Sequence, residues 1–337
     1  MHLAWQHIHP LAHQASRMPR PHWKDRRPPP LDGVPASVLH LPAPCPHALL
    51  LDHLAAQFPH IARASWEQRM RNRQVLDPNG LPLLPSAPTP AGQWIWYYRM
   101  PEHERAIPFA EDILFQDEYL VVADKPHFLP VSPTGRYAQE TLLARLQRRL
   151  QLPHLAPAHR LDRETAGLVV FTVQPGTRNA YASLFRERAV CKQYEAIASH
   201  NPALDLRTPL LYHSHLAPHA QDFFRMAQYA HLSPNSSTLI QLLEVLPRHR
   251  VRLLLQPHTG LRHQLRVHLQ ALGMPIVGDR FYPRVLHSAT AEESYQHPLQ
   301  LLARHLSFTD PITRQTRQFT SRRTLEESGQ RPPVNAC

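Results

Sequence analysis

A formal net charge of +11 over 337 residues attracts polyanions, so nucleic acid is the first candidate partner and an anionic membrane surface the second. The three cysteines, Cys45, Cys191 and Cys337, are odd in number and widely spaced, which argues against a disulfide framework or a cysteine-based zinc site. No apolar run is long enough to span a membrane and none resembles the core of a signal peptide, so we expect a soluble, cytoplasmic protein.

Residues 1 to about 46 are rich in proline, histidine and arginine, as in "RMPRPHWKDRRPPPLDG", and show no usable periodicity. Such a segment buries too little apolar surface to fold alone, so we expect residues 1–46 to be a disordered arm. Its basic side chains could touch RNA, although a solvated tail is the simpler interpretation. The end of the chain, residues 321–337, is likewise predicted to be a flexible tail.

Residues 47–100 are predicted to form a compact unit. Leucines from position 50 to 54 and Phe58 follow a helical spacing, and Ser65 with Gln68 three residues later forms a capping-box pattern that predicts the start of a second helix. "DPNG" at 77–80 predicts a turn, and "QWIWYYR" predicts a strand.

The second of these helices is basic. Its one acidic residue is Glu67, against Arg63, Arg69, Arg71 and Arg73. A basic helix is usually a solvated face, but in a basic protein and beside a short strand pair it favours RNA contact.

The rest of the chain, 107–320, mixes strand and helix patterns without the regular alternation of a doubly wound fold. "YLVVADKP", "AGLVVFTV", "RVRLLLQP" and "LSFTDP" predict strands. "TLLARLQRRLQ" predicts a helix with leucines on one face, and "LRHQLRVHLQALG" predicts a helix ended by Gly273. The mixture indicates an α+β architecture.

Asp162 stands within "HRLDRETAGLVVFTV", at the mouth of a predicted strand. A helix cap is excluded there because a strand follows, but a surface ion pair with Arg160 or Arg163, or a role in turning the loop, remains open. The functional alternative is an ionised carboxylate beside an apolar strand. A neighbouring guanidinium favours the charged form of a carboxylate, which makes it a competent nucleophile or base at neutral pH.

Two further segments offer partners for that carboxylate. "CKQYEAIA" places Tyr194 on a strand with Lys192, and "HTGLRHQLRVHLQALG" places Arg262 and Arg266 four residues apart, on one face of the predicted helix. The aspartate, the tyrosine and one arginine could converge in a single cleft. Taken alone, Tyr194 is as readily a core aromatic residue and Arg266 a surface charge.

These motifs resemble those of the RluA-type RNA pseudouridine synthases. "HRLDRETAGLVVF" resembles the family signature around its catalytic aspartate, "KQYEA" its Lys-x-Tyr segment, and "HQLRVHLQALGMPIVGDRFY" its third block. "ILFQDEYLVVADKP" and "LLARHLSFTDP" are similar to the opening and closing strands of the catalytic domain, so the resemblance spans 107–319 in the family's order. Residues 48–100 are more loosely similar to an S4-type RNA-binding module. One departure is visible: Leu261 stands where the family commonly has arginine, and Arg262 follows it.

The resemblance implies a fold and a reaction. The fold is a mixed, largely antiparallel sheet with flanking helices, preceded by a small S4-like α/β module. The reaction converts uridine to pseudouridine in ribosomal or transfer RNA by breaking the glycosidic bond, rotating the uracil and rejoining it through carbon 5. It needs no cofactor or metal, but the target nucleotide must be flipped out of its stack.

The resemblance also implies roles for individual residues. Asp162 acts at the target nucleotide, either by covalent addition or by abstracting a sugar proton, and Arg266 pairs with it. Tyr194 offers a flat face to the uracil and a hydroxyl near carbon 5. Arg160 suits a phosphate or the opened strand, and Lys192 adds phosphate affinity, as does the basic helix. We expect a monomer with no obligatory protein partner.

Two alternatives deserve comparison. The 25 histidines suggest a metal-dependent hydrolase, but His159 lacks a partner at helical spacing, and His263 and His268 are five apart, so they do not share a helical face. A non-catalytic RNA-binding protein on a synthase scaffold gains some support from Leu261. It is disfavoured because a protein without activity has no chemical reason to keep Asp162, Tyr194 and Arg266 together.

Overall fold

The computed structural model describes residues 27–101, 104–286 and 294–325, and the chain divides into two compact units. The described part of the first unit is 27–29 and 35–98, and the second contains 30–34 and everything described from Arg99 onward. None of the described helices is long and apolar enough to cross a membrane.

The first unit contains a three-stranded antiparallel sheet and two helices. The sheet order is β1 (Ser37–His40), β3 (Trp94–Tyr97) and β2 (Val75–Leu76). The helices are α1 (Leu50–Gln57) and α2 (Arg63–Arg71). Their apolar faces and the sheet enclose one core, which contains Leu50, Leu54, Trp66, Met70 and Ile95. The predicted helix at 50–58 and the predicted strand at 93–99 are thereby confirmed.

Two expectations for this region are wrong. The strand β1 lies within the segment expected to be a disordered arm, and it forms because its partner β3 comes from more than 50 residues later, which no local pattern reveals. Residues 1–26 of that arm lie outside the described residues. The capping box is also wrong: α2 begins at Arg63, its N-cap Ala62 makes no side-chain bond, and Ser65 is already helical.

The turn predicted from "DPNG" is confirmed, and its mechanism is local. Asp77 Oδ1 accepts hydrogen bonds from the backbone amides of Asn79 and Leu81, both at 2.8 Å. This is the usual way in which an aspartate side chain replaces a backbone carbonyl in a turn.

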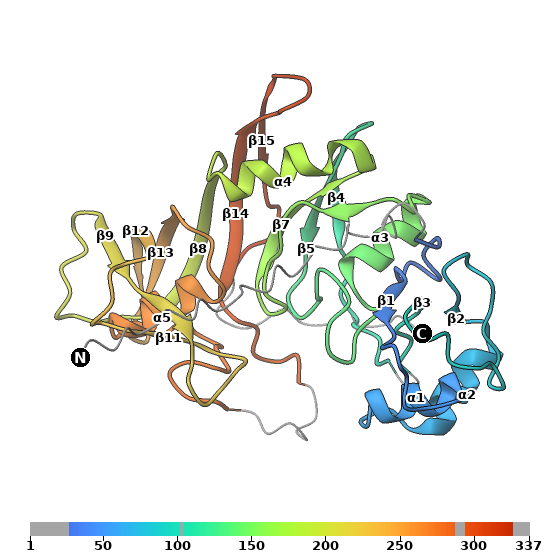
Figure 1. The fold of residues 1–337 in the computed structure, drawn as a ribbon. Helices are drawn as coiled ribbons and strands as arrows, with labels where there is room; N and C mark the ends of the chain where they lie inside the picture. The colour runs from blue at the N-terminus through green and yellow to red at the C-terminus, as the bar shows by residue number, and fades with distance from the viewer. Residues whose placement is uncertain (1–26, 102–103, 287–293, 326–337) are drawn as a thin grey trace, which may run out of the picture. The chain divides into compact units, whose positions relative to one another are not determined.

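The second unit is organised by a large mixed sheet (Figure 1). Its main path is β4 (Asp112–Gln116), β5 (Leu120–Lys125), β7 (Ala166–Thr172), β14 (Leu301–Thr309), β8 (Cys191–Ser199), β13 (Arg250–Pro257), β12 (Ser236–Leu246) and β9 (Leu210–Ser214). Two strands join at the sides, β15 (Thr316–Thr320) on β14 and β6 (Ala156–Pro157) on β7. A separate hairpin pairs β10 (Leu216–Pro218) with β11 (Met226–Gln228).

Helices cover both faces of this sheet. Alternate residues of β5 point to opposite sides: Val121 packs in the core beneath α3 (Leu142–Leu150), whereas Val122 packs in the core that contains Tyr181 of α4 (Arg178–Arg186). The short 3₁₀ turn Pro175–Thr177 leads into α4. A third helix, α5 (Gln264–Ala271), packs on the β8–β13–β12 half through Leu265 and Leu269.

The centre of the sheet depends on a close approach of two backbones. Among the described strand pairs, β7–β14 is parallel and the rest are antiparallel, so the predicted α+β, largely antiparallel fold is confirmed. Gly167 lies at this junction with φ +110°, and a Cβ there would lie 2.3 Å from the carbonyl oxygen of Ala303. Only glycine fits at this position, because any side chain would clash with the backbone of β14.

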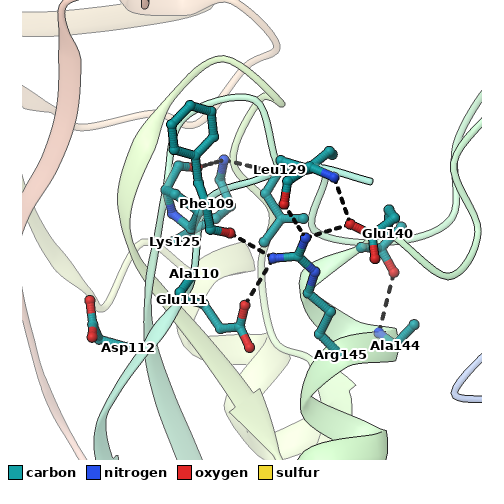
Figure 2. A network of polar contacts seen from close by, with 12 residues as sticks. Phe109, Ala110, Glu111, Asp112, Lys125, Leu129, Glu140, Ala144 and Arg145 are labelled. Carbon is teal, nitrogen blue, oxygen red and sulfur yellow. Dashed lines mark hydrogen bonds and ion pairs between the residues drawn. The ribbon is translucent and has the colours of Figure 1, made fainter. Parts of the chain in front are cut away.

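A partly buried arginine on α3, Arg145, fixes the segment that leads into the sheet (Figure 2). Arg145 donates to the carbonyls of Ile107 and Phe109 at 2.6 and 2.7 Å, and it pairs with Glu111 at 3.2 Å and with Glu140 at 2.5 Å. Glu140 in turn accepts from the amide of Ile107 at 2.8 Å. Backbone and carboxylates therefore saturate this guanidinium.

The start of the predicted C-terminal tail is also ordered. Ser321 and Leu325 are buried, and the Ser321 hydroxyl donates to both oxygens of Asp124, at 2.8 and 2.9 Å. The prediction was wrong for 321–325 because both residues contact distant strands: Asp124 of β5, which binds Ser321, is 197 residues earlier, and Leu325 packs with Ala166 and Leu302. Residues 326–337 lie outside the described residues.

Candidate active site

The loop between β6 and β7 carries Asp162, and a buried lysine at the end of β5 holds that loop. Lys125 is fully buried, and its ammonium donates to the carbonyls of Pro126, Leu129 and Arg163, at 2.9, 2.8 and 3.0 Å. Burial lowers the pKa of Lys125 to about 7, against the opposing charges of Glu164 and Asp162. The lysine thus ties the loop that carries Asp162 to the loop that follows β5.

Three further contacts hold the same loop in place. His127 Nδ1 donates to the carbonyl of Glu164 at 2.7 Å, and Arg163 Nε donates to the carbonyl of Phe128 at 2.9 Å. The amide of Thr165 donates to the carbonyl of Asp162 at 3.1 Å, which closes the turn. His127 and Phe128 follow β5 and the Asp162 loop leads into β7, so the pairing of β5 with β7 brings these groups together.

His159, the first residue of the "HRLD" motif, supports the loop from behind. Its Nε2 accepts from the amide of Val170 at 3.1 Å, and its ring stacks on Phe185 with centroids 4.2 Å apart. Burial, with the nearby charge of Lys192, lowers the pKa of His159 to about 3. The ring is therefore neutral and acts as a structural element.

Asp162 contacts Arg266 where the loop that carries Asp162 leads into β7. Arg266 Nη1 donates to Asp162 Oδ2 at 3.4 Å, so the expected pair is present. The side chain of Asp162 is 27% exposed, whereas that of Arg266 is 1% exposed. The carboxylate can therefore be reached from outside while the guanidinium cannot.

Arg266 has a stronger partner, which the sequence analysis missed. Asp279 accepts from Arg266 Nε and Nη2, both at 2.7 Å, and both side chains are 1% exposed. Burial alone lowers the pKa of Arg266, but the hydrogen bonds and charge of Asp279 outweigh this and raise it, so the group stays protonated. Asp279 belongs to the Gly-Asp pair of the third motif block, "HQLRVHLQALGMPIVGDRFY". An acidic residue in the block that also carries Arg266 is the signal that could have identified it.

Arg262 and Arg266 do not share a helical face, so that prediction was wrong. The helix α5 begins only at Gln264, because its N-cap His263 is in the left-handed conformation, with φ 53°. Arg262 thus lies before the helix on an exposed loop, where it donates to the carbonyls of Phe223 and Phe224. Arg266, one turn into the helix, points inward.

The same N-cap histidine is the second residue that the sequence analysis missed. His263 Nε2 lies 3.8 Å from Asp162 Oδ2, and its Nδ1 lies 2.9 Å from the hydroxyl of Tyr282. Burial, with the charges of Arg266 and Arg262, lowers the pKa of His263 to about 3. A neutral imidazole therefore borders Asp162 on the side next to Arg266. The sequence analysis considered His263 only as a metal ligand.

Tyr194 reaches the same site from β8. Burial raises the pKa of its phenol, and the charge of Asp162 raises it further, so the hydroxyl is protonated at neutral pH. Lys192 lies two residues earlier and hence on the same face of β8. Its ammonium donates to the carbonyl of Thr259 at 3.1 Å, and burial, with Arg188, lowers its pKa. The structure therefore gives Lys192 an intramolecular contact in addition to any RNA contact.

The other predicted RNA-binding residues are Arg160, beside Asp162 in the chain, and four arginines of the first unit. Arg160 is exposed, two residues before Asp162. In the first unit, Arg63 pairs with Asp52 at 2.9 Å, Arg71 pairs with Glu67, and Arg69 lies over the ring of Trp66, 4.9 Å from its centroid. Arg73 is exposed just after α2. Two of these four arginines on and after α2 are thus engaged by carboxylates.

A search for metal-ligating groups gives a negative result for the described ranges. Within 27–101, 104–286 and 294–325, no three or more His, Cys, Asp or Glu side chains form a group that could hold a metal ion.

Comparison with known proteins agrees with this geometry. A family model described as RNA pseudouridylate synthase matches residues 119–271, which include Asp162, Tyr194 and Arg266. An uncharacterized RNA pseudouridine synthase of Synechocystis is 31% identical over 69% of this chain and 79% of its own length. The dual-specificity RNA pseudouridine synthase RluA of Haemophilus influenzae is 33% identical over 63% of this chain and 92% of its own length. The chain belongs to the RluA family of RNA pseudouridine synthases.

The solved structures agree on the fold of this RluA-type synthase. Human RNA pseudouridylate synthase domain containing 1 superposes with a TM-score of 0.52 at 22% identity, over 65% of this chain and 86% of that one. The family membership makes the protein an isomerase that acts on RNA. The alternative of a metal-dependent hydrolase is thereby set aside.

Proposed function

We propose that this RluA-type synthase isomerises specific uridines in ribosomal or transfer RNA, and that Asp162 is its catalytic residue. The observation that carries the proposal is the asymmetry of one ion pair: a buried arginine lies against an accessible carboxylate, 3.4 Å away. The RluA relatives are named as dual-specificity RNA synthases, which supports an RNA substrate for this chain as well.

Asp162 suits attack on, or proton removal from, the target nucleotide. Arg266 and His263 both face its Oδ2. Asp279 fixes the position of Arg266, so Arg266 holds Asp162 in the same orientation before and after the substrate binds. A preorganised carboxylate needs little rearrangement when the nucleotide arrives.

Tyr194 supplies the second function that the reaction needs. Its protonated phenol presents an aromatic face for the uracil ring. Its hydroxyl is the polar end of the side chain near the carboxylate of Asp162, whose charge raises the pKa of the phenol. We propose that the ring supports the rotating base and that the hydroxyl lies near carbon 5, where a proton must leave.

The exposed arginines would contact the RNA itself. A stacked nucleotide is inaccessible, so the target must be flipped, and Arg160, exposed on the same loop as Asp162, would hold the opened strand or a phosphate. Arg262 and Lys192 would add to this contact.

We propose that the first unit is an S4-like RNA-binding module whose arginines, Arg63, Arg69, Arg71 and Arg73, bind phosphates without reading sequence. The enzyme would act as a monomer, without an obligatory protein partner, since it must accommodate a large RNA.

The test uses unmodified tRNA and ribosomal RNA transcripts, in which pseudouridine is mapped by chemical adduct and primer stop. Wild-type protein is expected to create at least one new stop. Asp162→Asn keeps the size of the side chain and is expected to slow that modification by on the order of 10³-fold. Asp205→Asn is the matched control, since Asp205 pairs with Arg207 on an exposed loop and should leave the stop intact.

Two results would contradict the proposal. If wild-type protein binds these RNAs in a salt-sensitive manner yet creates no stop, the chain is a non-catalytic binder. If Asp162→Asn is as active as wild type, another residue performs the chemistry.

A further inference from the structure

The hairpin β10–β11 carries an unusually exposed aromatic side chain. Phe223 is 84% exposed, whereas the next most exposed large apolar side chain in the described ranges, Leu81, is 64% exposed. Its neighbour on the hairpin, Gln221, is exposed and polar. The side chain of Arg262 donates to the backbone carbonyl of Phe223. A protein partner would thus gain a single ring there rather than an apolar patch.

Ring contacts connect this side chain to the catalytic site. Phe223 meets Phe224 edge to face at 5.6 Å, and Phe224 meets Phe281 at 5.5 Å. Phe281 lies against His263, with centroids 5.8 Å apart and planes at 29°. His263 is the residue 3.8 Å from Asp162. Aromatic rings therefore run from the solvent to the catalytic carboxylate.

Polar contacts of two residues, Arg262 and Tyr282, fix the hairpin beside the site. Arg262 Nη1 and Nη2 donate to the carbonyls of Phe223 and Phe224, at 3.3 and 2.5 Å. On the other strand, the amide of Met226 donates to the hydroxyl of Tyr282 at 2.8 Å, and that hydroxyl also lies 2.9 Å from His263. Arg262 directly follows Leu261, the position at which this chain departs from the family pattern.

We propose that Phe223 stacks on an unpaired base of the substrate RNA next to the flipped uridine, and that Arg262 is a positioning residue that holds the hairpin for it. This rests on the proposed function. RNA read in single-stranded loops offers splayed bases, and a flat aromatic ring accepts any base without a hydrogen-bond code. Phe223 would therefore favour target uridines that have an unpaired base beside them, whichever base that is.

The experiment measures kcat and KM on the unmodified tRNA and ribosomal RNA transcripts, and RNA binding in the Asp162→Asn background. Phe223→Ala is expected to raise KM and weaken binding by about 10-fold, with kcat unchanged. Phe223→Trp should restore both, because it keeps the stacking face. The number of released counterions, read from the salt dependence of binding, should not change, since no charge is removed. Val245→Ala, at an exposed apolar position of β12, is the control and should have no effect.

Arg262 is tested by a double-mutant cycle. Arg262→Met is expected to raise KM several-fold, and the pair Arg262→Met and Phe223→Ala should be no worse than Phe223→Ala alone apart from the lost charge. Full additivity would overturn the positioning role.

The stacking proposal falls if Phe223→Ala leaves KM and binding unchanged, or if Phe223→Trp fails to restore them. Its failure is distinguishable from failure of the catalytic proposal. A wild-type protein that makes no pseudouridine but loses RNA affinity on Phe223→Ala would retain the stacking role and lose the isomerase assignment.

Discussion

Two arginines of the second unit, Arg145 and Arg266, each lie between two carboxylates but differ in what they leave exposed. Arg145 lies between Glu111 and Glu140 and also binds two backbone carbonyls. Arg266 lies between Asp279 and Asp162. The carboxylates around Arg145 are both largely buried. In the second cluster, the side chain of Asp162 is 27% exposed and its contact with Arg266 is longer, at 3.4 Å.

The difference shows what turns an ion pair into a site. At Arg145, both carboxylates are largely buried and one of them, Glu140, also binds backbone, so nothing is left for a ligand. At Arg266, Asp279 accepts from Nε and Nη2 at 2.7 Å, and Asp162 accepts from Nη1 at the longer distance of 3.4 Å. Saturating the arginine from one side leaves the opposite acid oriented but accessible to substrate.

The largest expected effect follows from removing Asp279, which breaks the site cluster. Asp279→Ala leaves Arg266 buried without its main partner, and we expect the free energy of unfolding to fall by about 4 kcal/mol and the activity to fall with it. Asp279→Asn, which keeps the shape but not the charge, should be less damaging to stability. Urea unfolding with activity assays on the folded fraction checks both, and an unchanged midpoint for Asp279→Ala would refute the assigned role.

Removing the other arginine should separate stability from catalysis. Arg145→Met leaves two acids and two carbonyls without their donor, so we expect a loss of about 3 kcal/mol in the free energy of unfolding. The kcat of the remaining folded enzyme should be unchanged, because the cluster lies on α3 rather than at Asp162. Arg149→Met, exposed on the same helix, is the control. A fall in kcat without loss of stability would contradict the comparison.

Acid should weaken the second unit through its buried histidines. Burial lowers the pKa to about 4 for His127 and His268, and to about 3 for His159 and His263, from an ordinary value of 6.5. Below pH 6.5 the unfolded chain binds protons that the folded chain does not, so stability, complete above that pH, falls as the pH drops toward 4. Each such histidine contributes up to about 1.4 kcal/mol per pH unit.

The measurement for this effect is urea unfolding between pH 7 and pH 4.5. His268→Gln removes one of the four titrating groups and should reduce the slope of stability against pH, even if it lowers stability at pH 7 through its lost bonds to Ser214 and Thr238. An unaltered slope would mean that acid acts elsewhere.

The smallest effect is expected where the chain departs from its family. Leu261 is 36% exposed, so Leu261→Arg should be accommodated without a change in stability beyond about 0.5 kcal/mol. One added phosphate contact should tighten RNA binding a few-fold and steepen its salt dependence by about one unit. Filter binding at several salt concentrations tests this, and an unchanged slope would show that this side chain faces away from the RNA.

The sequence by itself determined the strands and helices whose patterns are local. The apolar run that opens β5, residues 120–123, and the leucine face of α3 need no partner to be recognised, because an apolar run and a helical spacing are properties of neighbouring residues. The motif around Asp162, with its resemblance to one family, also indicated the aspartate, the tyrosine and the pairing arginine.

Only the tertiary structure decided which polar groups share a buried space. β1 required a partner from β3, and the Arg266–Asp279 pair required α5 to start one residue after a left-handed His263, so that one arginine turns inward and Arg262 stays outside. The free energy of a buried charge depends on what surrounds it, and residues distant in sequence supply those surroundings. The chemistry was therefore readable in the motifs, and the orientation of each group was a product of folding.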